Sequence, residues 1–175
     1  MKRRPGITAR RDMRGIPLLA AGFLTAAALA FAGQASAATP VIGTFQFNEQ
    51  FIDEGASTAC GFPVSVDLTG GGMYRVFSDE QGNPTRIQVH TDATGTMSAN
   101  GITLQEVDHN TDFIDLQAGT ETLVGIVFRE FLSGLGVVIM DVGRLSGTDG
   151  SVTFEAGPHP ALDGDLTRLC AALTP

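Results

Sequence analysis

Short runs of strand-forming residues, separated by residues typical of tight turns, restrict the fold of this chain more than any other feature. From Ala38 onward, runs rich in Val, Ile, Phe and Thr alternate with Gly, Asn and Asp at intervals of roughly 8–12 residues. Within Val64–Leu68 and Ile87–His90, apolar and polar residues alternate, as in a strand that buries one face. Short connections join antiparallel strands, whereas parallel pairs need long crossovers. The rhythm therefore predicts an all-β, mostly antiparallel fold.

We expect about eight to ten strands in a single domain. The expected strands are Thr44–Ile52, Val64–Leu68, Met73–Ser78, Ile87–His90, Thr94–Ser98, Ile102–Val107, Asp112–Leu116, Glu121–Phe131, Gly136–Val142 and Ser151–Glu155. Asn100-Gly101 favours a type I′ hairpin turn, because both central residues of that turn need a positive φ. A long meander closes most simply into a barrel, which leaves no exposed edge. We therefore predict a β-barrel, with a β-sandwich as the alternative.

One short helix is expected near the end of the chain. Between Asp163 and Leu173, apolar residues recur at the spacing of one helix face, namely Leu166, Leu169, Cys170 and Leu173. The acidic residues at the start of this segment suit a helix N-terminus, where the backbone dipole favours negative charge.

Residues 1–37 have the three parts of a secretory signal peptide. Six of the eleven Lys and Arg residues lie within the first fourteen positions, an apolar run covers Ile16–Ala32, and Ala35-Ser36-Ala37 forms a cleavage site of small residues. A membrane anchor is the alternative, but the run is short and rich in Ala. Arg10-Arg11 leaves twin-arginine export open beside general secretion. We expect cleavage after Ala37 and a secreted, extracellular domain over residues 38–175.

The charge of that domain excludes one class of partner. From Ala38 onward the chain has five Arg, no Lys and eighteen Asp and Glu, so its net charge is 5 − 18 = −13. An acidic protein without a basic patch is not a nucleic-acid binder that neutralises phosphates, and its charge disfavours a partner that sits on anionic lipid. We therefore expect no nucleic-acid partner and no membrane attachment after cleavage.

The two cysteines, Cys60 and Cys170, are expected to form a disulfide. Both lie after the signal peptide, and an even pair in an exported protein indicates a disulfide. Two buried free thiols are the alternative. A zinc site of the usual kind needs more cysteines or well-placed histidines than this.

Each of the three histidines has an ordinary structural interpretation. His90 alternates with Ile87 and Val89, which places it on the solvent face of a strand. His109 lies in the polar stretch Asp108–Asp112, which we interpret as a turn, and His159 lies between two prolines in a loop. We therefore predict no catalytic residue, no metal ligand and no cofactor. A pair such as Asp141 with His159 is the arrangement that an acid–base enzyme would use.

The motifs of several other kinds of binding and catalytic site are absent from the sequence. The sequence has no nucleophile elbow, no phosphate-binding loop and no calcium loop of the EF-hand kind. Trp is absent and Tyr74 is the only Tyr, which argues against modules that stack sugars or bases on exposed rings.

The chain resembles a group of small, uncharacterised secreted actinobacterial proteins. The resemblance rests on short blocks spread over most of the chain after the signal peptide: Cys60–Val64, Phe77–Asp79 with Gly82-Asn83, Asp141–Arg144, Phe154–His159 and Leu169–Leu173. It implies export from a Gram-positive cell, with both cysteines as features of the group. It implies no activity.

Two function classes remain from the sequence. The first is a secreted, non-catalytic β-domain that binds a small apolar ligand or a protein partner, or that has a structural role in the envelope. The alternative is a secreted enzyme that uses His159 or His109 with nearby Asp residues for acid–base chemistry.

The signal peptide generates a first prediction. Protein recovered from the medium of a secreting bacterial host should begin at Ala38, because the small residues at 35 and 37 match the cleavage site. N-terminal sequencing checks this, and a secreted product that begins at Met1 would contradict it.

Overall fold

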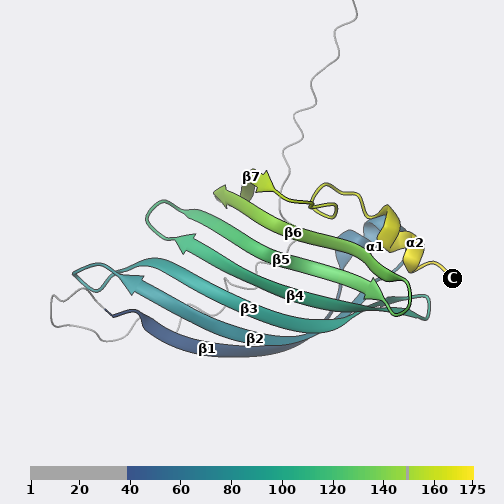
Figure 1. Ribbon diagram of the computed structural model, residues 1–175, viewed down its shortest axis with the longest axis horizontal. Helices are drawn as coiled ribbons and strands as arrows, with labels where there is room; N and C mark the ends of the chain where they lie inside the picture. Colours follow the sequence, from purple (N-terminus) through teal and green to yellow (C-terminus); the bar gives the residue numbers. More distant parts are fainter. Residues whose placement is uncertain (1–38, 149) are drawn as a thin grey trace, which may run out of the picture.

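The computed structural model describes residues 39–148 and 150–175, and the predicted signal peptide and the predicted first residue Ala38 lie outside this range. Seven antiparallel strands form one sheet in chain order, and two short helices accompany it (Figure 1). The strands are β1 (Val41–Ile52), β2 (Ser65–Ser78), β3 (Pro84–Ala99), β4 (Ile102–Asp115), β5 (Thr120–Leu132), β6 (Gly136–Thr148) and β7 (Ser151–Ala156). The helices are α1 (Glu54–Cys60) and α2 (Thr167–Ala172).

Tight turns set the pairing of successive strands, as the β3–β4 hairpin shows. Asn100 and Gly101 have φ angles of 53° and 80°, which confirms the predicted type I′ turn. From this turn the register continues without a shift to the pair Arg86 and Asp115. A two-residue turn therefore determines which side chains meet along the whole length of β3 and β4.

The strands are longer and fewer than predicted, seven in place of about eight to ten. Three pairs of predicted strands are each part of one continuous strand: Val64–Leu68 and Met73–Ser78 fall in β2, Ile87–His90 and Thr94–Ser98 in β3, and Ile102–Val107 and Asp112–Leu116 in β4. Only the end residues Val64 and Leu116 lie just outside these strands. The interpretation of Asp108–Asp112 as a turn was wrong. The segment has a neighbouring strand on each side, and hydrogen bonding to both outweighs the turn preference of its Asp and Asn residues.

The glycine triplet Gly70–Gly72 lies inside β2 and is not a chain reversal. A Cβ on Gly72 would collide with the backbone oxygen of His90 on β3, so only glycine permits this close approach. On β1, the rings of Phe45 and Phe47 are stacked with their centroids 6.3 Å apart and reach over Gly72 and Gly70. Aromatic rings thus replace the side chains that the glycines lack.

The described strands form an open sheet, with β1 and β7 as its edges. The predicted closure into a barrel or a sandwich is therefore not confirmed. The all-β, antiparallel class is confirmed.

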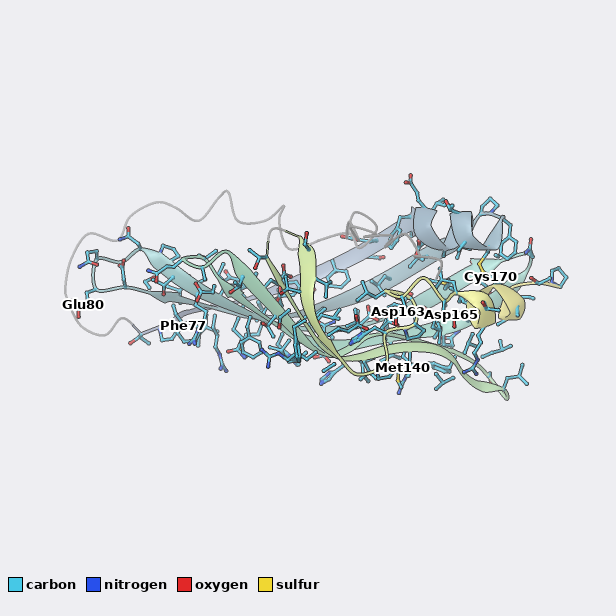
Figure 2. The ribbon with its side chains drawn as sticks, turned by 90° about the horizontal axis from the view of Figure 1, so that it is seen from above. Phe77, Glu80, Met140, Asp163, Asp165 and Cys170 are labelled. Atoms are coloured by element: carbon cyan, nitrogen blue, oxygen red, sulfur yellow. A yellow bond between two sulfur atoms is a disulfide. The ribbon has the colours of Figure 1, made fainter. Side chains whose placement is uncertain are left out.

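Both helices lie on one face at the same end of the sheet, and neither of them reaches over the far end, near Phe77 and Glu80 (Figure 2). Helix α1 was not predicted. Asp53 caps its N-terminus, since an Asp53 carboxylate oxygen accepts a hydrogen bond of 2.9 Å from the Ala56 amide, and Gly61 ends it with a φ of 77°. The predicted C-terminal helix is present but begins later than expected, at Thr167.

The hydrophobic core lies between these helices and the near half of the sheet. Its buried members come from both helices and from strands β2, β3, β4 and β6: Ala56, Val66, Leu68, Ala93, Met97, Ala99, Leu104, Val138, Ile139 and Leu169, together with Val64 and Leu173 beside them. We call the face that carries this core the inner face and the opposite face the outer face. Within the described residues, no helix has both the length and the hydrophobicity needed to span a membrane.

The predicted disulfide is confirmed. Cys60, the last residue of α1, is bonded to Cys170 in α2, with 5.0 Å between the two Cα atoms. The bond closes a loop of 110 residues and joins the two helices that cover the core. Disulfides persist in oxidising compartments, so this bond points to a non-cytoplasmic environment.

The disulfide generates the second prediction. Replacing both cysteines, Cys60→Ala with Cys170→Ala, should lower the free energy of unfolding by up to about 4–5 kcal/mol, because the unfolded chain regains the freedom that the long loop had removed. Urea denaturation of the variant and of the oxidised parent measures this difference. Two free thiols in the denatured, unreduced parent would contradict the pairing.

Candidate functional site

Two histidines and an aspartate gather on the outer face, on the central strands β3 and β4. Asp92 and His109 are direct partners in the register, and His90 lies two residues from Asp92 on the same strand. His90 Nε2 is 3.3 Å from an Asp92 carboxylate oxygen, and His109 Nδ1 forms a short hydrogen bond with the other oxygen. The potential ligand atoms of the three residues all lie within 4.8 Å of one another. We call this group the His–Asp cluster.

The surroundings of the His–Asp cluster orient it and leave it accessible. His90 Nδ1 is 3.1 Å from the hydroxyl of Thr111, which holds the ring with Nε2 towards Asp92. The rings of His90 and His109 meet edge to face, with centroids 5.0 Å apart. The side chains of His90, Asp92 and His109 are 37%, 62% and 58% exposed. Solvent therefore reaches all three residues.

A hollow adjoins the His–Asp cluster on the β2 side. It has a volume of about 210 Å³ and is lined by Met73, Arg75, Gln88, His90 and Thr111. The cluster thus has open space next to one of its imidazoles.

The electrostatics of the cluster favour a charged carboxylate. The hydrogen bond from His109 lowers the pKa of Asp92, and the nearby charges of His109 and His90 lower it further. Asp92 therefore stays ionised over the whole neutral range.

The inner face holds a second group of polar residues, three carboxyl groups that we call the buried acids. Glu106 on β4 and Glu130 on β5 are direct partners, and Asp108 lies on the same face of β4. Glu130 is completely buried and Glu106 is 7% exposed. Among the described residues, no N–H or hydroxyl group donates to either carboxyl oxygen of Glu130 or to one oxygen each of Glu106 and Asp108. The carboxyl groups of Glu106 and Glu130 instead share a side-chain hydrogen bond with each other.

Burial favours the protonated form of these acids. It raises the pKa of Glu130 to about 9, with a further contribution from the charge of Glu106, and it raises the pKa of Asp108 to about 8. The pKa of Glu106 is also raised, mainly by burial. Further along the inner face, burial and the charge of Glu121 raise the pKa of Asp112 to about 8. At neutral pH much of this face is therefore uncharged, despite its acidic sequence.

Asp141 and His159 are brought together, but as part of the core. Asp141 on β6 accepts hydrogen bonds from the backbone amides of Ala161 and Leu162, at 3.1 and 3.3 Å, which anchors the loop after β7. Burial raises the pKa of Asp141, while these amides and the nearby His159 oppose the rise. His159 is 1% exposed, and its Nε2 contacts the backbone oxygen of Ala156 at 3.3 Å. The pair is closed to solvent.

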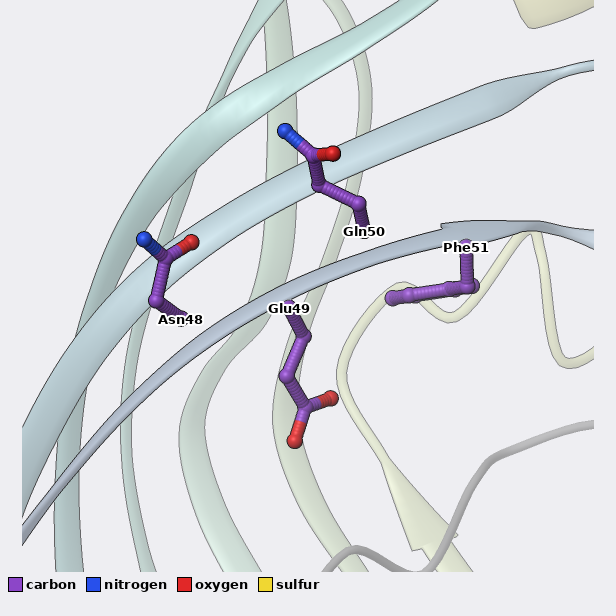
Figure 3. A pocket seen from close by; sticks show the side chains of 4 residues that line it. All are labelled: Asn48, Glu49, Gln50 and Phe51. Atoms are coloured by element: carbon purple, nitrogen blue, oxygen red, sulfur yellow. The ribbon is translucent and has the colours of Figure 1, made fainter.

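The free edge of β1 is the third feature of interest. Strand β1 pairs with β2 on one side, and none of the described strands lies along its other side. An open hollow of about 530 Å³ is lined there by four consecutive residues, Asn48, Glu49, Gln50 and Phe51 (Figure 3). Figure 3 shows Asn48 and Gln50 on one side of the strand and Glu49 and Phe51 on the other. Because the hollow is lined by residues from both faces of β1, it lies along the edge of the strand.

The three histidines considered in the sequence analysis lie on two opposite faces of the sheet. His90 is on the solvent face of a strand, as predicted, and His159 is in a loop, as predicted, but fully enclosed. His109 is in a strand and not in a turn, which brings it to His90. The two candidates for acid–base catalysis, His109 and His159, therefore do not share one site.

The His–Asp cluster was not predicted from the sequence, although a signal for it existed. When the residues on either side of the Asn100-Gly101 turn are paired one by one, Asp92 falls opposite His109 and His90 opposite Thr111. The assignment of Asp108–Asp112 to a turn ended the predicted strand before His109, so this pairing was not made.

Comparisons with known proteins identify no relative: no family model, no curated protein and no solved structure matches this chain.

The buried acids generate the third prediction. In the folded protein Glu130 keeps its proton up to a pKa of about 9, whereas in the unfolded chain it loses the proton near 4.5. The folded state therefore binds more protons between these values, and the free energy of unfolding should fall as the pH rises through this window. The slope is up to about 1.4 kcal/mol per pH unit for each extra proton. Urea denaturation from pH 5 to about pH 9 measures it.

Glu130→Gln should reduce this slope, because the amide is neutral at every pH. The variant should be more stable than the parent at about pH 8 and similar to it at about pH 5. Glu80→Gln is the control, since Glu80 is exposed in a turn and should leave the slope unchanged. A stability that is constant or rises across the window would contradict the buried, protonated state.

Proposed function

We propose that this protein is a secreted, non-catalytic β-domain that binds a protein partner by adding an extended segment of that partner to the free edge of β1. The observation that carries the proposal is the unpaired edge of a twelve-residue strand with an open hollow along it. Unpaired backbone N–H and C=O groups on such an edge are a template for a further strand.

The sequence of β1 supports this use of the edge. Proteins usually protect a free edge by means of Pro, Lys, a bulge or a short strand. Strand β1 has no Pro and no Lys, its single charged residue is Glu49, and its register with β2 continues without a shift from Val41 to Ile52. The opposite edge is the much shorter β7, with six residues. Strand addition is therefore favoured at β1.

Charge selects the kind of partner. With five Arg and eighteen acidic residues after the signal peptide, two copies of this chain repel one another, whereas a cationic segment is attracted. A small apolar ligand is less well supported, because the hollow at β1 is lined by Asn48, Glu49 and Gln50 beside a single Phe51. We therefore assign the site to an extended, basic segment of another protein.

Secretion is part of the same proposal. The disulfide is compatible with an extracellular location, and the basic, apolar and small-residue segments of residues 1–37 supply the export signal. The resemblance to secreted actinobacterial proteins supports the same location. A closed barrel, the arrangement predicted from the sequence, would use the β1 edge for its own closure, and the experiment below separates the two arrangements.

The fourth prediction tests the β1 edge with a defined probe, a ten-residue peptide of alternating Lys and Val. Calorimetric titration should show binding to the exported domain, and hydrogen exchange should slow in Val41–Ile52 but not in Ser151–Ala156. Asn48→Lys should weaken binding about tenfold, because a lysine on an edge strand opposes strand addition and repels the peptide.

A matched variant separates strand pairing from charge alone. Gln105→Lys also replaces an exposed amide by a cation, but on β4, which is paired on both sides. It should leave the affinity within about twofold of the parent. Equal weakening by both variants, or no binding, would contradict the proposal. Hydrogen exchange without the peptide is a further check. If the amides of β1 then exchange as slowly as those of β3, the edge is already occupied, as it would be in a barrel.

A further inference from the structure

We propose that the His–Asp cluster is a binding site for a divalent transition-metal ion, with His90, Asp92 and His109 as its ligands. This site is separate from the β1 edge and does not depend on the function proposed there. It rests on three residues of ligating type whose ligand atoms lie within 4.8 Å of one another on two paired strands.

The distances in the cluster fit a bound ion. Zinc binds imidazole nitrogen and carboxylate oxygen at about 2.0–2.2 Å, so two ligand atoms in a tetrahedral site lie about 3.3–3.5 Å apart. His90 Nε2 and the Asp92 oxygen are already 3.3 Å apart. His109 Nδ1 forms a hydrogen bond with the other oxygen of Asp92, and the ring must move away from this oxygen to share an ion.

The strands hold the ligands in place before an ion arrives. Asp92 and His109 are opposite one another in the β3–β4 register, which has no shift along its length. Thr111 bonds the second ring nitrogen of His90 and so points Nε2 towards the site. Thr111 is a positioning residue, because it acts on the metal through His90.

The ligand chemistry selects the class of ion. Two imidazoles with one carboxylate suit zinc, copper, nickel or iron, whereas calcium and magnesium prefer sites made only of oxygen. Three protein ligands leave at least one coordination position for water or for a ligand from outside the protein.

The neighbourhood leaves room for that further ligand. The residue beside Asp92 on β2 is Gly71, which has no side chain, and the hollow of about 210 Å³ adjoins His90. The exposed cluster therefore has an entry path from solvent.

Binding requires one proton to move. The hydrogen bond between His109 Nδ1 and Asp92 places a proton between the two atoms that would bind the ion. The ion needs the lone pair of Nδ1, so this proton leaves to solvent or the ring changes tautomer. The carboxylate of Asp92 is the one anionic ligand of the site.

The fifth prediction uses Zn²⁺ and Co²⁺ as probes of the exported domain with its disulfide intact. Calorimetry should show about one Zn²⁺ per chain, and Co²⁺ should give the visible absorption of a site with imidazole ligands. His90→Ala, Asp92→Asn and His109→Ala should each weaken Zn²⁺ binding at least about 100-fold, and Thr111→Val about tenfold, as removal of an outer-shell partner does. A large excess of Ca²⁺ should not displace Zn²⁺.

Asp67→Asn is the matched control. It removes the same charge from the same outer face, at an exposed position outside the cluster, and should change the affinity by less than about twofold. The three ligand positions are partly or largely exposed, so their variants should fold, and thermal unfolding of each variant checks this. Zinc binding that all three variants retain, equal losses in Asp67→Asn and Asp92→Asn, or no stoichiometric binding would each overturn the site.

Discussion

Pairing of every strand with its neighbours in sequence is the constraint on which the rest of this structure depends. The strand order is the chain order, so each strand pairs with the strand before it and the strand after it in the chain. In the β3–β4 pair, which has no register shift, the hairpin turn alone decides the register. The Asn100-Gly101 turn, for example, places Asp92 against His109 more than a dozen residues away along the chain. A one-residue slip at this turn would put Asp92 and His109 on opposite faces of the sheet and abolish the cluster.

The two faces of the sheet differ because only one of them is covered. Helices α1 and α2, joined by the disulfide, cover one end of the inner face and form the core with it. Carboxyl groups that point to this face, above all Glu130, are removed from water and hold their protons. The same alternation sends His90, Asp92 and His109 to the outer face, where solvent keeps them accessible. Burial therefore separates a neutral acidic face from a face that can bind ions.

Much of the fold was predictable, and the errors have identifiable causes. Alternation predicted the strands and their antiparallel pairing, and the positive φ of Asn100 and Gly101 confirmed the turn. The strand breaks at Gly70–Gly72 and Asp108–Asp112 were wrong because local preference ignores the neighbouring strands, which supply aromatic cover to the first and hydrogen-bond partners to the second. Helix α1 was missed because seven residues between two strands give too little periodicity, although Asp53 and Gly61 carry its capping pattern.

The sequence by itself determined the all-β class, the hairpin at Asn100-Gly101, the negative charge and the identity of the disulfide, since Cys60 and Cys170 are the only cysteines. These properties follow from local alternation, turn geometry and composition. The tertiary structure decided which histidines meet, which acids are buried and which of the described strands lie at the edges of the sheet. Distance and burial depend on packing between residues far apart in the chain, so a pattern read along the chain does not contain them. His90 and His109 share a site and His159 does not, because strand register joins the first two and the loop after β7 encloses the third.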